Sequence, residues 1–391
     1  MERQRKHVVV VGGGIIGVSF AYYASQLAAS SPESPQLSIT LVEAETIACA
    51  ASGKAGGFLA RSWPSGASST LATLSWEMHE AAVASFPPGV RESVGYRKIR
   101  TVMAALGRDG DVVRDGEEME RVLGAGDAGW MDGDGIAEVE VADEGEGTAQ
   151  ITPYPYVMAL LEAARGVDGV EIEVREGTRV VGFHPKGEGK GVGGVVVEGG
   201  EVVEGDDVVI AMGPWSGMVN QWLSELEGGG DDVDVDVDVD GEAAYSWVVS
   251  GPRVLSTAVF LDEGTEVYPR PDGSVYVCSG NVPWFPLPAT QAEVVVDAEQ
   301  IGELKKTMAR FAPTLFADAE TLVEQACYLP IRRGEDQTPL IGRLYGENVW
   351  IAAGHSVWGV LMSPATGLGL AQLVLGVGVG EGGVDVAAFA P

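Results

Sequence analysis

The amino-acid sequence predicts an α/β fold with two lobes, one built on a parallel sheet and the other on a separate β-sheet. The length of 391 residues exceeds one ordinary domain of about 100–200 residues. A β-branched run, residues 7–11, enters a glycine turn that leads to a helical stretch and a second strand. Strand-rich blocks at residues 170–216 and 247–277 supply further strands.

The first turn of the chain carries a G-x-G-x-x-G pattern formed by Gly12, Gly14 and Gly17. Gly12 allows a tight turn, Gly14 lets the backbone approach a pyrophosphate, and Gly17 lets the helix pack close to the strand. The N-terminus of that helix presents free N–H groups and a partial positive charge to phosphates. On its own, the pattern could also serve close packing.

A second strand, residues 37–42, ends in Glu43. A carboxylate at this point can accept both hydroxyl hydrogens of an adenosine ribose. Glu43 lies somewhat beyond the usual spacing of about 20 residues because an insert, residues 30–36, lengthens the connection. The sequence therefore has a strand, a glycine turn, a helix, a second strand and an acidic residue in the order that is typical of a dinucleotide site. This order predicts that the chain binds a dinucleotide.

Composition narrows the cellular setting. Hydrophobic residues make up 46% of the chain, which is enough for a sizeable core, and no apolar run approaches the ~20 residues of a membrane span. The first strand begins within seven residues, which leaves no room for a targeting peptide. The chain has three scattered cysteines without a C-x-x-C pair, namely Cys49, Cys278 and Cys327. Such a sparse set is typical of reduced thiols rather than of a disulfide framework. We therefore expect a cytoplasmic protein without a membrane span.

The formal net charge of -32 argues against nucleic acid and anionic membranes as partners. Much of the charge lies in two acidic segments, residues 109–147 and 231–240. Alternating aspartates could suggest calcium, but the glycine and the terminal glutamate of an EF-hand loop are missing. Both segments are therefore expected to be solvated, flexible inserts, and no metal site is expected.

The remaining elements follow from periodicity and turn residues. A loop of small residues covers 50–58, where a cofactor or backbone passes close. Ser363 is expected to cap a final helix that begins at Pro364 or Ala365. The other expected helices span residues 70–86, 156–165 and 298–311, and the other expected strands span 170–174, 178–183, 194–197, 202–203, 207–211 and 348–353.

Several separated stretches resemble the FAD-dependent oxidoreductases of the D-amino-acid oxidase and glycine oxidase type, in particular a fungal, cytosolic branch of them. Together they span nearly the whole chain except the acidic segments. The matching stretches are residues 9–17, 41–57, 177–180, 208–216, 266–273, 338–342 and 354–367.

The resemblance implies a two-lobe flavoprotein of the glycine oxidase kind. One lobe would be a Rossmann-like FAD-binding domain made of residues 1–90, 151–225 and 336–391. The other would be a β-sheet substrate domain made of residues 91–150, with the first acidic segment, and 226–335, with the Asp-rich loop 231–240.

The resemblance also implies which residues hold FAD. They are Gly12, Gly14, Ile15, Ile16 and Gly17 at the pyrophosphate, Glu43 and Ala44 at the ribose, Ala51, Ser52, Gly56 and Gly57 toward the pyrophosphate and isoalloxazine, Val180 at adenine, Gly213 near the ribityl chain, and Gly354, His355, Gly359, Ser363 and Thr366 at the pyrimidine edge. A helix N-terminus there would stabilise the negative charge of reduced flavin. Cys327 lacks the neighbours of covalent relatives, so FAD is expected to be non-covalent.

Two residues near the flavin are open to two interpretations. His355 is either a local hydrogen-bonding residue or a catalytic base. Lys54 is either a surface lysine or a cation near flavin N5 that polarises a water for oxygen activation.

The substrate end departs from the family pattern. Counting back from Pro339 places Ile331 where amino-acid oxidases hold the substrate carboxylate with an arginine, and a shifted loop would be needed for Arg332 or Arg333 to take that role. The tyrosine position is occupied by Glu266, which would repel a carboxylate and favour a cation unless an arginine pairs with it. The substrate is then an amine without a carboxylate, or the site is rebuilt, or turnover is lost.

The resemblance implies oxidation of a C–N bond in an amine or amino acid. Hydride would pass to flavin N5, the imine would be hydrolysed by water, and molecular oxygen would accept the electrons and form peroxide. The alternative is a flavin-binding regulatory or trafficking-associated protein with little turnover, whose ligand is a protein partner. A nicotinamide dehydrogenase is disfavoured because the terminal Gly-His loop would have no role in it.

Overall fold

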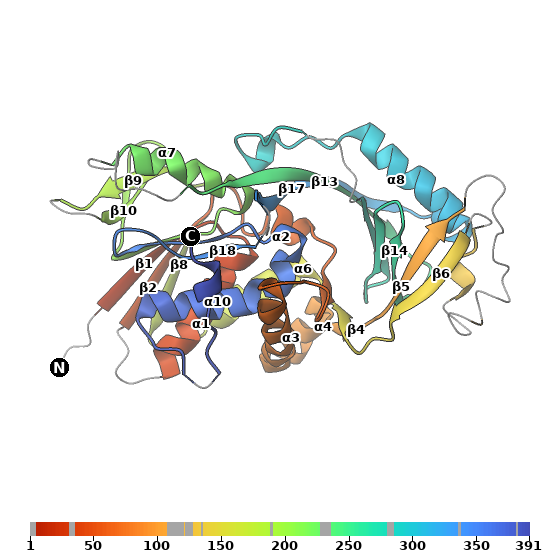
Figure 1. The fold of residues 1–391 in the computed structure, drawn as a ribbon, viewed down its shortest axis with the longest axis horizontal. Helices are drawn as coiled ribbons and strands as arrows, with labels where there is room; N and C mark the ends of the chain where they lie inside the picture. Colours follow the sequence, from red (N-terminus) through yellow and green to blue (C-terminus); the bar gives the residue numbers. More distant parts are fainter. Residues whose placement is uncertain are drawn as a thin grey trace.

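A computed structural model shows two lobes lying side by side (Figure 1). We refer to them as the cofactor lobe, which contains β1, and the cap lobe, which contains β14. The structure describes residues 5–30, 36–107, 121, 128–133, 136–187, 191–226, 236–279, 285–334, 338–380 and 382–391.

The cofactor lobe is built on a six-stranded sheet with the order β18-β19-β12-β1-β2-β8. Neighbouring strands are parallel except for β18, which pairs with β19 in antiparallel fashion. The strands are β1 (Arg5–Val11), β2 (Gln36–Val42), β8 (Val170–Arg175), β12 (Asp207–Ile210), β18 (Leu340–Tyr345) and β19 (Val349–Ala353).

The valine run of β1 explains why this strand lies at the centre. Val8 and Val10 pack into one hydrophobic cluster, and Val9 and Val11 pack into another on the opposite face of the sheet. Side chains alternate between the two faces of a strand, so a continuous apolar run is stable only where both faces are covered.

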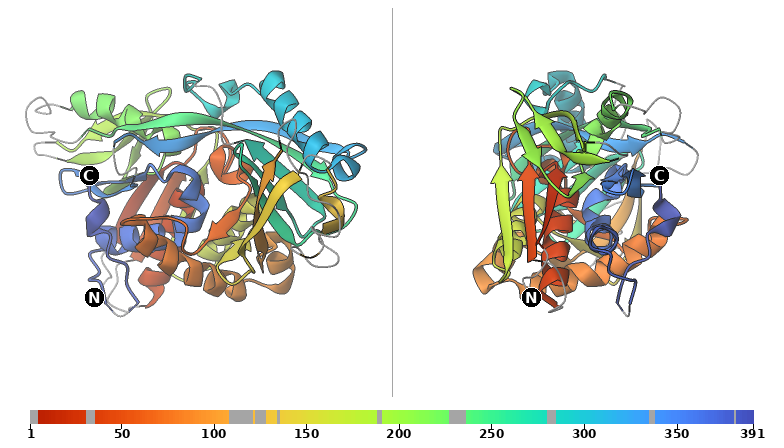
Figure 2. Two further views of the ribbon diagram at one scale, coloured as in Figure 1. Left: turned by 45° about the vertical axis from the view of Figure 1, so that its right-hand side comes forward. Right: turned by 90° about the vertical axis from the view of Figure 1, so that its left-hand side faces the viewer.

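Helices cover one face of this sheet, and a small sheet covers the other (Figure 2). The helices are α1 (Ile15–Ser30), α3 (Ser68–Ser85), α6 (Pro153–Arg165) and α10 (Gly359–Leu375). The small sheet and its helix are β9 (Val180–Pro185), β10 (Val192–Val197), β11 (Val202–Glu204) and α7 (Val219–Ser224).

The cap lobe is built on a seven-stranded sheet with the order β17-β13-β16-β15-β14-β5-β6. The 12-residue strands β13 and β17 pair along their length and reach from the cap lobe back over the cofactor lobe (Figure 1). The strands are β5 (Arg100–Leu106), β6 (Ile136–Asp143), β13 (Val239–Ser250), β14 (Thr257–Leu261), β15 (Thr265–Pro269), β16 (Ser274–Ser279) and β17 (Thr321–Arg332).

Helix α8 (Ala298–Phe311) covers the outer side of the cap sheet. The Asp297 side chain caps its N-terminus by accepting hydrogen bonds from the N–H groups of Glu299 and Gln300. Its buried residues, spaced by three or four positions, form one apolar stripe against the sheet. They are Ile301, Leu304, Met308 and Phe311.

The remaining elements are short. A three-stranded sheet, β3-β7-β4, lies between the helices and the cap sheet. These elements are α2 (Ala51–Lys54), β3 (Phe58–Ala60), α4 (Pro88–Val94), β4 (Arg97–Lys98), β7 (Thr148–Gln150), α9 (Pro313–Phe316) and the 3-10 turns η1 (Ala128–Trp130), η2 (Gly213–Met218), η3 (Gln291–Glu293), η4 (Ser356–Trp358) and η5 (Ala387–Phe389).

The predicted fold class, a two-lobe α/β protein, is confirmed. The six-stranded sheet takes strands from residues 5–42, 170–210 and 340–353, and the cap sheet takes strands from 100–143 and 239–332. This distribution is compatible with discontinuous lobes. The boundaries at residues 90, 150, 225 and 335 stay a prediction.

The expected start of the last helix is wrong. Helix α10 begins at Gly359 rather than Pro364, with Trp358 as its N-cap. Ser363 lies inside the helix, and its hydroxyl donates to the carbonyl of Val360. Sequence reasoning failed here because Pro364 was taken as a first-turn residue, whereas the packing of α10 retains it in the helix interior.

Two side chains of α3 replace the helical hydrogen bonds that Pro364 disturbs. A proline has no N–H and leaves the carbonyl four residues earlier, that of Val360, without its helical donor. His79 Nε2 donates to the carbonyls of Val360, at 3.1 Å, and Leu361, at 2.9 Å. The N–H of Ala365, which a regular helix would direct to Leu361, donates to Ser75 Oγ at 3.1 Å.

The expectation for the acidic segments is partly wrong. Much of 109–147 lies outside the described residues, but Ile136–Asp143 forms the edge strand β6. In the second segment, residues 231–235 lie outside the described residues, and residues 236–240 lead into β13. Val237 and Val239 are buried in the core of the cofactor lobe, so this part of the segment is structural.

The expectation that no apolar segment is long enough to span a membrane also needs correction. The helix spanning residues 356–375 is long and apolar enough to cross a membrane by length and composition, contrary to the expectation that no segment would be. However, 72% of its most apolar window is buried inside the protein, where α10 packs against α1 and α3. Such extensive burial is typical of a helix in the core of a protein.

The bond between His79 and α10 predicts a pH dependence of stability. Burial lowers the pKa of His79 to about 4, and within the described residues its Nδ1 has no hydrogen-bond partner for a second proton. The folded state therefore binds fewer protons than the unfolded state, so stability is present above pH 6.5 and is lost as the pH falls toward 4. The loss amounts to about 1.4 kcal/mol per pH unit in that window.

Urea unfolding at pH 6.5 and pH 5.0 tests this. The His79→Gln variant keeps an N–H donor but does not titrate, so it should lose about 2 kcal/mol less than the native protein between the two pH values. The comparison with the variant isolates His79 from Glu43 and Glu266, whose raised pKa values act in the opposite direction. Replacing the half-buried His184 with Gln serves as the control. Equal pH slopes for native protein and His79→Gln would contradict the prediction.

Candidate active site

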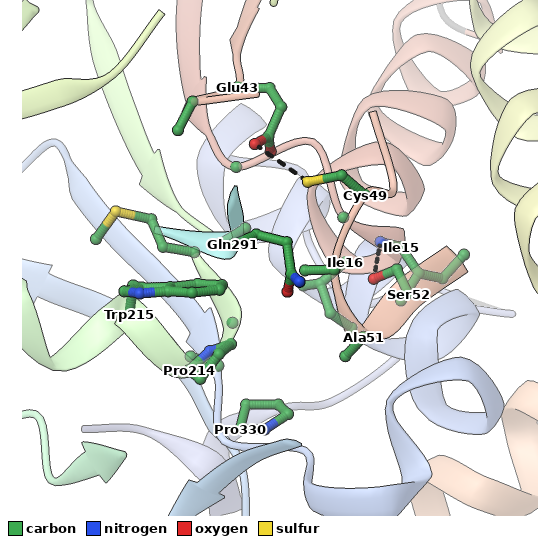
Figure 3. A pocket seen from close by; sticks show the side chains of 18 of the residues that line it. Ile15, Ile16, Glu43, Cys49, Ala51, Ser52, Pro214, Trp215, Gln291 and Pro330 are labelled. Carbon is green, nitrogen blue, oxygen red and sulfur yellow. Dashed lines mark hydrogen bonds between the residues drawn. The ribbon is translucent and has the colours of Figure 1, made fainter. Parts of the chain in front are cut away.

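A large cavity lies at the carboxyl ends of β1, β2, β12 and β19, where ligands bind in open α/β sheets. Its volume is about 1310 Å³ when the solvent-filled space at its opening is included. Figure 3 shows side chains from both lobes converging on it.

The glycine turn forms the base of the cavity. Gly12 has φ +111°, and a Cβ placed on it would lie 2.3 Å from the carbonyl oxygen of Ala211. A Cβ on Gly17 would lie 2.1 Å from the carbonyl oxygen of Gly12. Both contacts are with backbone, so both positions require glycine.

The start of α1 provides an anion site. Gly14, Ile15 and Ile16 line the cavity with the first turn of the helix, where N–H groups lack helical partners and the dipole is positive. The N–H of Ile15 donates to Ser52 Oγ at 2.8 Å. A Cβ on Gly14 would lie 2.9 Å from that hydroxyl oxygen, so the glycine keeps the approach to the helix end open.

Glu43 marks one end of the cavity. Its carboxylate accepts from the N–H groups of Gly13, at 2.8 Å, and Glu45, at 3.0 Å. Burial raises its pKa against the opposing effect of these hydrogen bonds. Ala44, Cys49 and Val180 line the cavity at the same end, and the Cys49 Sγ lies 4.0 Å from a Glu43 carboxylate oxygen.

The start of α10 marks the other end. His355 and Gly359 line the cavity, and His355 Nε2 lies 3.0 Å from Thr366 Oγ1. Burial lowers the pKa of His355 to about 3, so the imidazole is neutral. The cavity therefore runs between two helix N-termini, as a site for a long, anionic dinucleotide would.

The comparison with known families agrees with this geometry. Residues 7–373 match the DAO family, described as FAD dependent oxidoreductase.

The chain belongs to the DAO family of FAD-dependent oxidoreductases.

Similar proteins share nearly the whole length of this DAO-family chain. A candidate oxidoreductase of Schizosaccharomyces pombe, C1F5.03c, is 27% identical over 394 residues, which cover 97% of each chain. The crystal structure of glycine oxidase from Geobacillus kaustophilus matches with a TM-score of 0.75 and 20% identity, over 99% of this chain and 98% of that one. Iminodiacetate oxidase from Chelativorans sp. BNC1 matches with a TM-score of 0.71 and 16% identity, over 98% of both chains.

The residues of this DAO-family protein fit FAD. The turn at Gly12 and Gly14 and the start of α1 would hold the pyrophosphate, and Glu43 would hold the adenosine ribose. The start of α10 would face the pyrimidine edge of the flavin. Gln291, whose buried Oε1 has no partner among the described residues, points into the space between these ends (Figure 3).

Most of the predicted cofactor-binding residues lie on the cavity wall. They are Gly12, Gly14, Ile15, Ile16, Glu43, Ala44, Ala51, Ser52, Val180, Gly213, His355 and Gly359.

The other predicted cofactor residues lie behind the wall. Gly56 packs against Tyr268, Gly57 packs against the carbonyl of Ile151, and Gly354 packs against Arg332. Gly17 and Ser363 serve the packing of α1 and α10, and Thr366 contacts the cavity through His355. Whether the flavin reaches any of these residues stays a prediction.

Each of the four candidate catalytic residues has a hydrogen-bond partner within the protein. Lys54 lies at the end of α2 rather than in a loop, and its Nζ donates to the carbonyl of Ala326 at 2.9 Å. Arg332 donates to the carbonyl oxygen and the hydroxyl oxygen of Thr338. Glu266 accepts hydrogen bonds from Tyr268 and Cys278. Of the four, His355 lines the cavity.

Sequence reasoning did not identify several wall residues. Pro214 and Trp215 follow Gly213, and the Gly-Pro-Trp-Ser run could have indicated them. Leu329, Pro330 and Gln291 come from the cap lobe. These three carry no motif, because only the packing of the lobes brings them to the cavity.

A substitution at Gly14 should abolish FAD binding. A valine there would crowd Ser52 Oγ and cover the helix end that receives the pyrophosphate. Purified Gly14→Val should be colourless and fail to bind added FAD in a fluorescence titration. Gly302→Val, in open space on α8, is the control for a glycine-to-valine change and should remain yellow. A yellow Gly14→Val protein would show that the helix end is not the pyrophosphate site.

The flavin should be released without breaking a covalent bond. Cys49 lies at the Glu43 end of the cavity, Cys278 contacts Glu266, and Cys327 is buried on β17. Acid precipitation should leave the yellow colour in the supernatant, with the spectrum of FAD. Colour retained in the pellet would disprove this.

Proposed function

We propose that this protein oxidises a carbon–nitrogen bond of an amine or amino acid. Bound FAD supplies the hydride acceptor. The net reaction consumes substrate, oxygen and water, and it yields a carbonyl compound, the released amine or ammonia, and hydrogen peroxide. The residues of the chain bind the substrate, orient it and exclude water.

The observation that carries the proposal is the closure of the cavity by the cap sheet. Leu329 and Pro330 of β17 line the same cavity as Gly359 at the start of α10, where the flavin end is expected. A substrate held there would be enclosed by both lobes and aligned with the flavin. Support also comes from the glycine and iminodiacetate oxidases, which share this two-lobe arrangement over nearly their whole length.

The environment of Glu266 supports a cationic or neutral amine as substrate. Burial raises the pKa of its carboxyl group, while hydrogen bonds from Tyr268 and Cys278 favour the ionised form. Tyr268 packs on Gly56, which follows Ala55 on the cavity wall. The carboxylate therefore lies one layer of side chains behind the wall.

Arg332 and Arg333 have partners other than Glu266. Arg332 is bound to Thr338, and Arg333 pairs with Asp240. The contacts of both arginines therefore favour an unpaired Glu266 over the alternative in which one of them pairs with it.

A cluster of three aromatic side chains includes Tyr268, the hydrogen-bond partner of Glu266. Phe58 and Tyr268 are stacked, with ring centroids 5.3 Å apart, and Phe260 lies beside both. Aromatic faces and a carboxylate both attract organic cations.

Glu266→Gln tests the substrate charge. At an effective dielectric of about 20, two unit charges of the same sign about 8 Å apart repel by about 2 kcal/mol, which corresponds to about 30-fold in affinity. The variant should weaken oxidation of amines and improve that of free amino acids, measured as kcat/KM from peroxide release. Glu242→Gln, on the exposed side of β13, is the control and should leave selectivity unchanged. Unchanged selectivity in Glu266→Gln, or efficient turnover of simple D-amino acids by the native protein, would refute the assignment.

We extend the proposal to the setting of the reaction: molecular oxygen as the electron acceptor and the cytoplasm as the compartment. Oxygen consumption matched by peroxide release across a panel of amines and amino acids would support turnover. Absence of turnover in a yellow, FAD-loaded protein would favour the regulatory alternative, in which a protein partner is the ligand.

A further inference from the structure

One segment of the cap lobe forms part of the wall of the cofactor cavity. It comprises residues 288–293, between β16 and α8, and we refer to it as the strap segment. It ends in the 3-10 turn η3, and Ala289, Thr290 and Gln291 line the cavity. Since FAD binds between the lobes, this segment is in a position to cover it.

Two hydrogen bonds attach the strap segment to the cofactor lobe. The indole Nε1 of Trp215, in η2 after β12, donates to the carbonyl of Pro288 at 2.8 Å. The N–H of Ala292 donates to a carboxylate oxygen of Glu45, just beyond β2. The segment therefore spans the cavity from the η2 side to the β2 side.

Gln291 extends from the strap segment into the cavity. The residue is 9% exposed, and its buried Oε1 lacks a hydrogen-bond partner among the described residues. Figure 3 shows the amide in the middle of the cavity, between Ile16 and Trp215. Buried side-chain amides in native proteins are nearly always paired, so an unpaired one inside a ligand cavity indicates a partner in the ligand.

We infer that Gln291 is a ligand of FAD contributed by the cap lobe. Ile16 belongs to the first turn of α1, where the pyrophosphate is expected, and Trp215 lies beyond Gly213 toward the ribityl chain. An amide has donors for a phosphate oxygen and an acceptor for a hydroxyl group. Gln291 Nε2 donates to the pyrophosphate, and its Oε1 accepts from a ribityl hydroxyl.

This contact has a consequence for cofactor exchange. If the strap segment covers the middle of the cofactor, separation of its bonds to Trp215 and Glu45 would speed the release of FAD. Bound FAD also joins the two lobes through Gln291. The inference depends on the FAD cofactor of the family and not on the proposed amine oxidation.

The experiment measures FAD binding to the apoprotein of Gln291→Ala by fluorescence titration, and FAD release after dilution. The Kd should rise ten-fold to a hundred-fold, equivalent to about 1.4–2.8 kcal/mol, mainly through faster dissociation. The melting temperature of the apoprotein should not fall, because no protein partner of the amide is lost. Gln221→Ala, which removes a surface amide that bonds Glu225, is the control and should bind FAD normally.

Gln291→Glu provides a second test with nearly the same side-chain shape. The carboxylate cannot donate to the pyrophosphate and would repel it, so this variant should bind FAD more weakly than Gln291→Ala. Native Kd and dissociation rate in both variants would overturn the inference. A lower melting temperature of the Gln291→Ala apoprotein with unchanged FAD affinity would also overturn it, since that result indicates a purely structural side chain.

Discussion

The structure depends on close approach of backbone to backbone around the first turn of the chain. The carbonyl of Ala211 occupies the space of a side chain at Gly12, and the carbonyl of Gly12 occupies that at Gly17. A third contact, Gly367 of α10 against the backbone of Ser19, joins the two central helices in the same way. These contacts hold the carboxyl end of β12, the start of α1 and the middle of α10 around one cavity, so any Cβ at these positions would displace a wall of the site.

The helix that closes the far end of the cavity contains a proline whose effect is compensated by a neighbour. Pro364 disrupts the hydrogen bonding of α10 one turn after its start, and Ser75 and His79 of α3 restore it. Because these residues are four apart, they lie on the same face of α3. Helix α10 can therefore continue through the proline, and its N-terminus reaches the cavity at Gly359 instead of stopping short of it. The neutral state of His79 is a condition of this arrangement, since Nδ1 is buried without an acceptor among the described residues.

The cap lobe adds to the FAD-binding lobe a second set of cavity walls. Leu329 and Pro330 reach the cavity from the long strand β17, and the strap segment reaches it from the other side. Behind this wall lies Glu266, held by Tyr268 and Cys278 and bordered by aromatic rings. The chain as a whole is strongly acidic, with a formal net charge of -32. Exposed charges are screened over about 10 Å of salt solution, whereas the role proposed for Glu266 rests on a carboxyl group buried behind the wall.

Local patterns in the sequence determined the fold class, the dinucleotide turn at Gly12–Gly17 with Glu43, and helix α8 over residues 298–311, because each depends on neighbours close in the chain. Only the tertiary structure decided the rest. Residues that meet across the lobes, such as Gln291 and Trp215, carry no local signal. The interior position of Pro364 depends on side chains nearly 300 residues away in α3. Likewise, Val237 and Val239 are core residues despite their Asp-rich surroundings, because β13 joins the two lobes at that point.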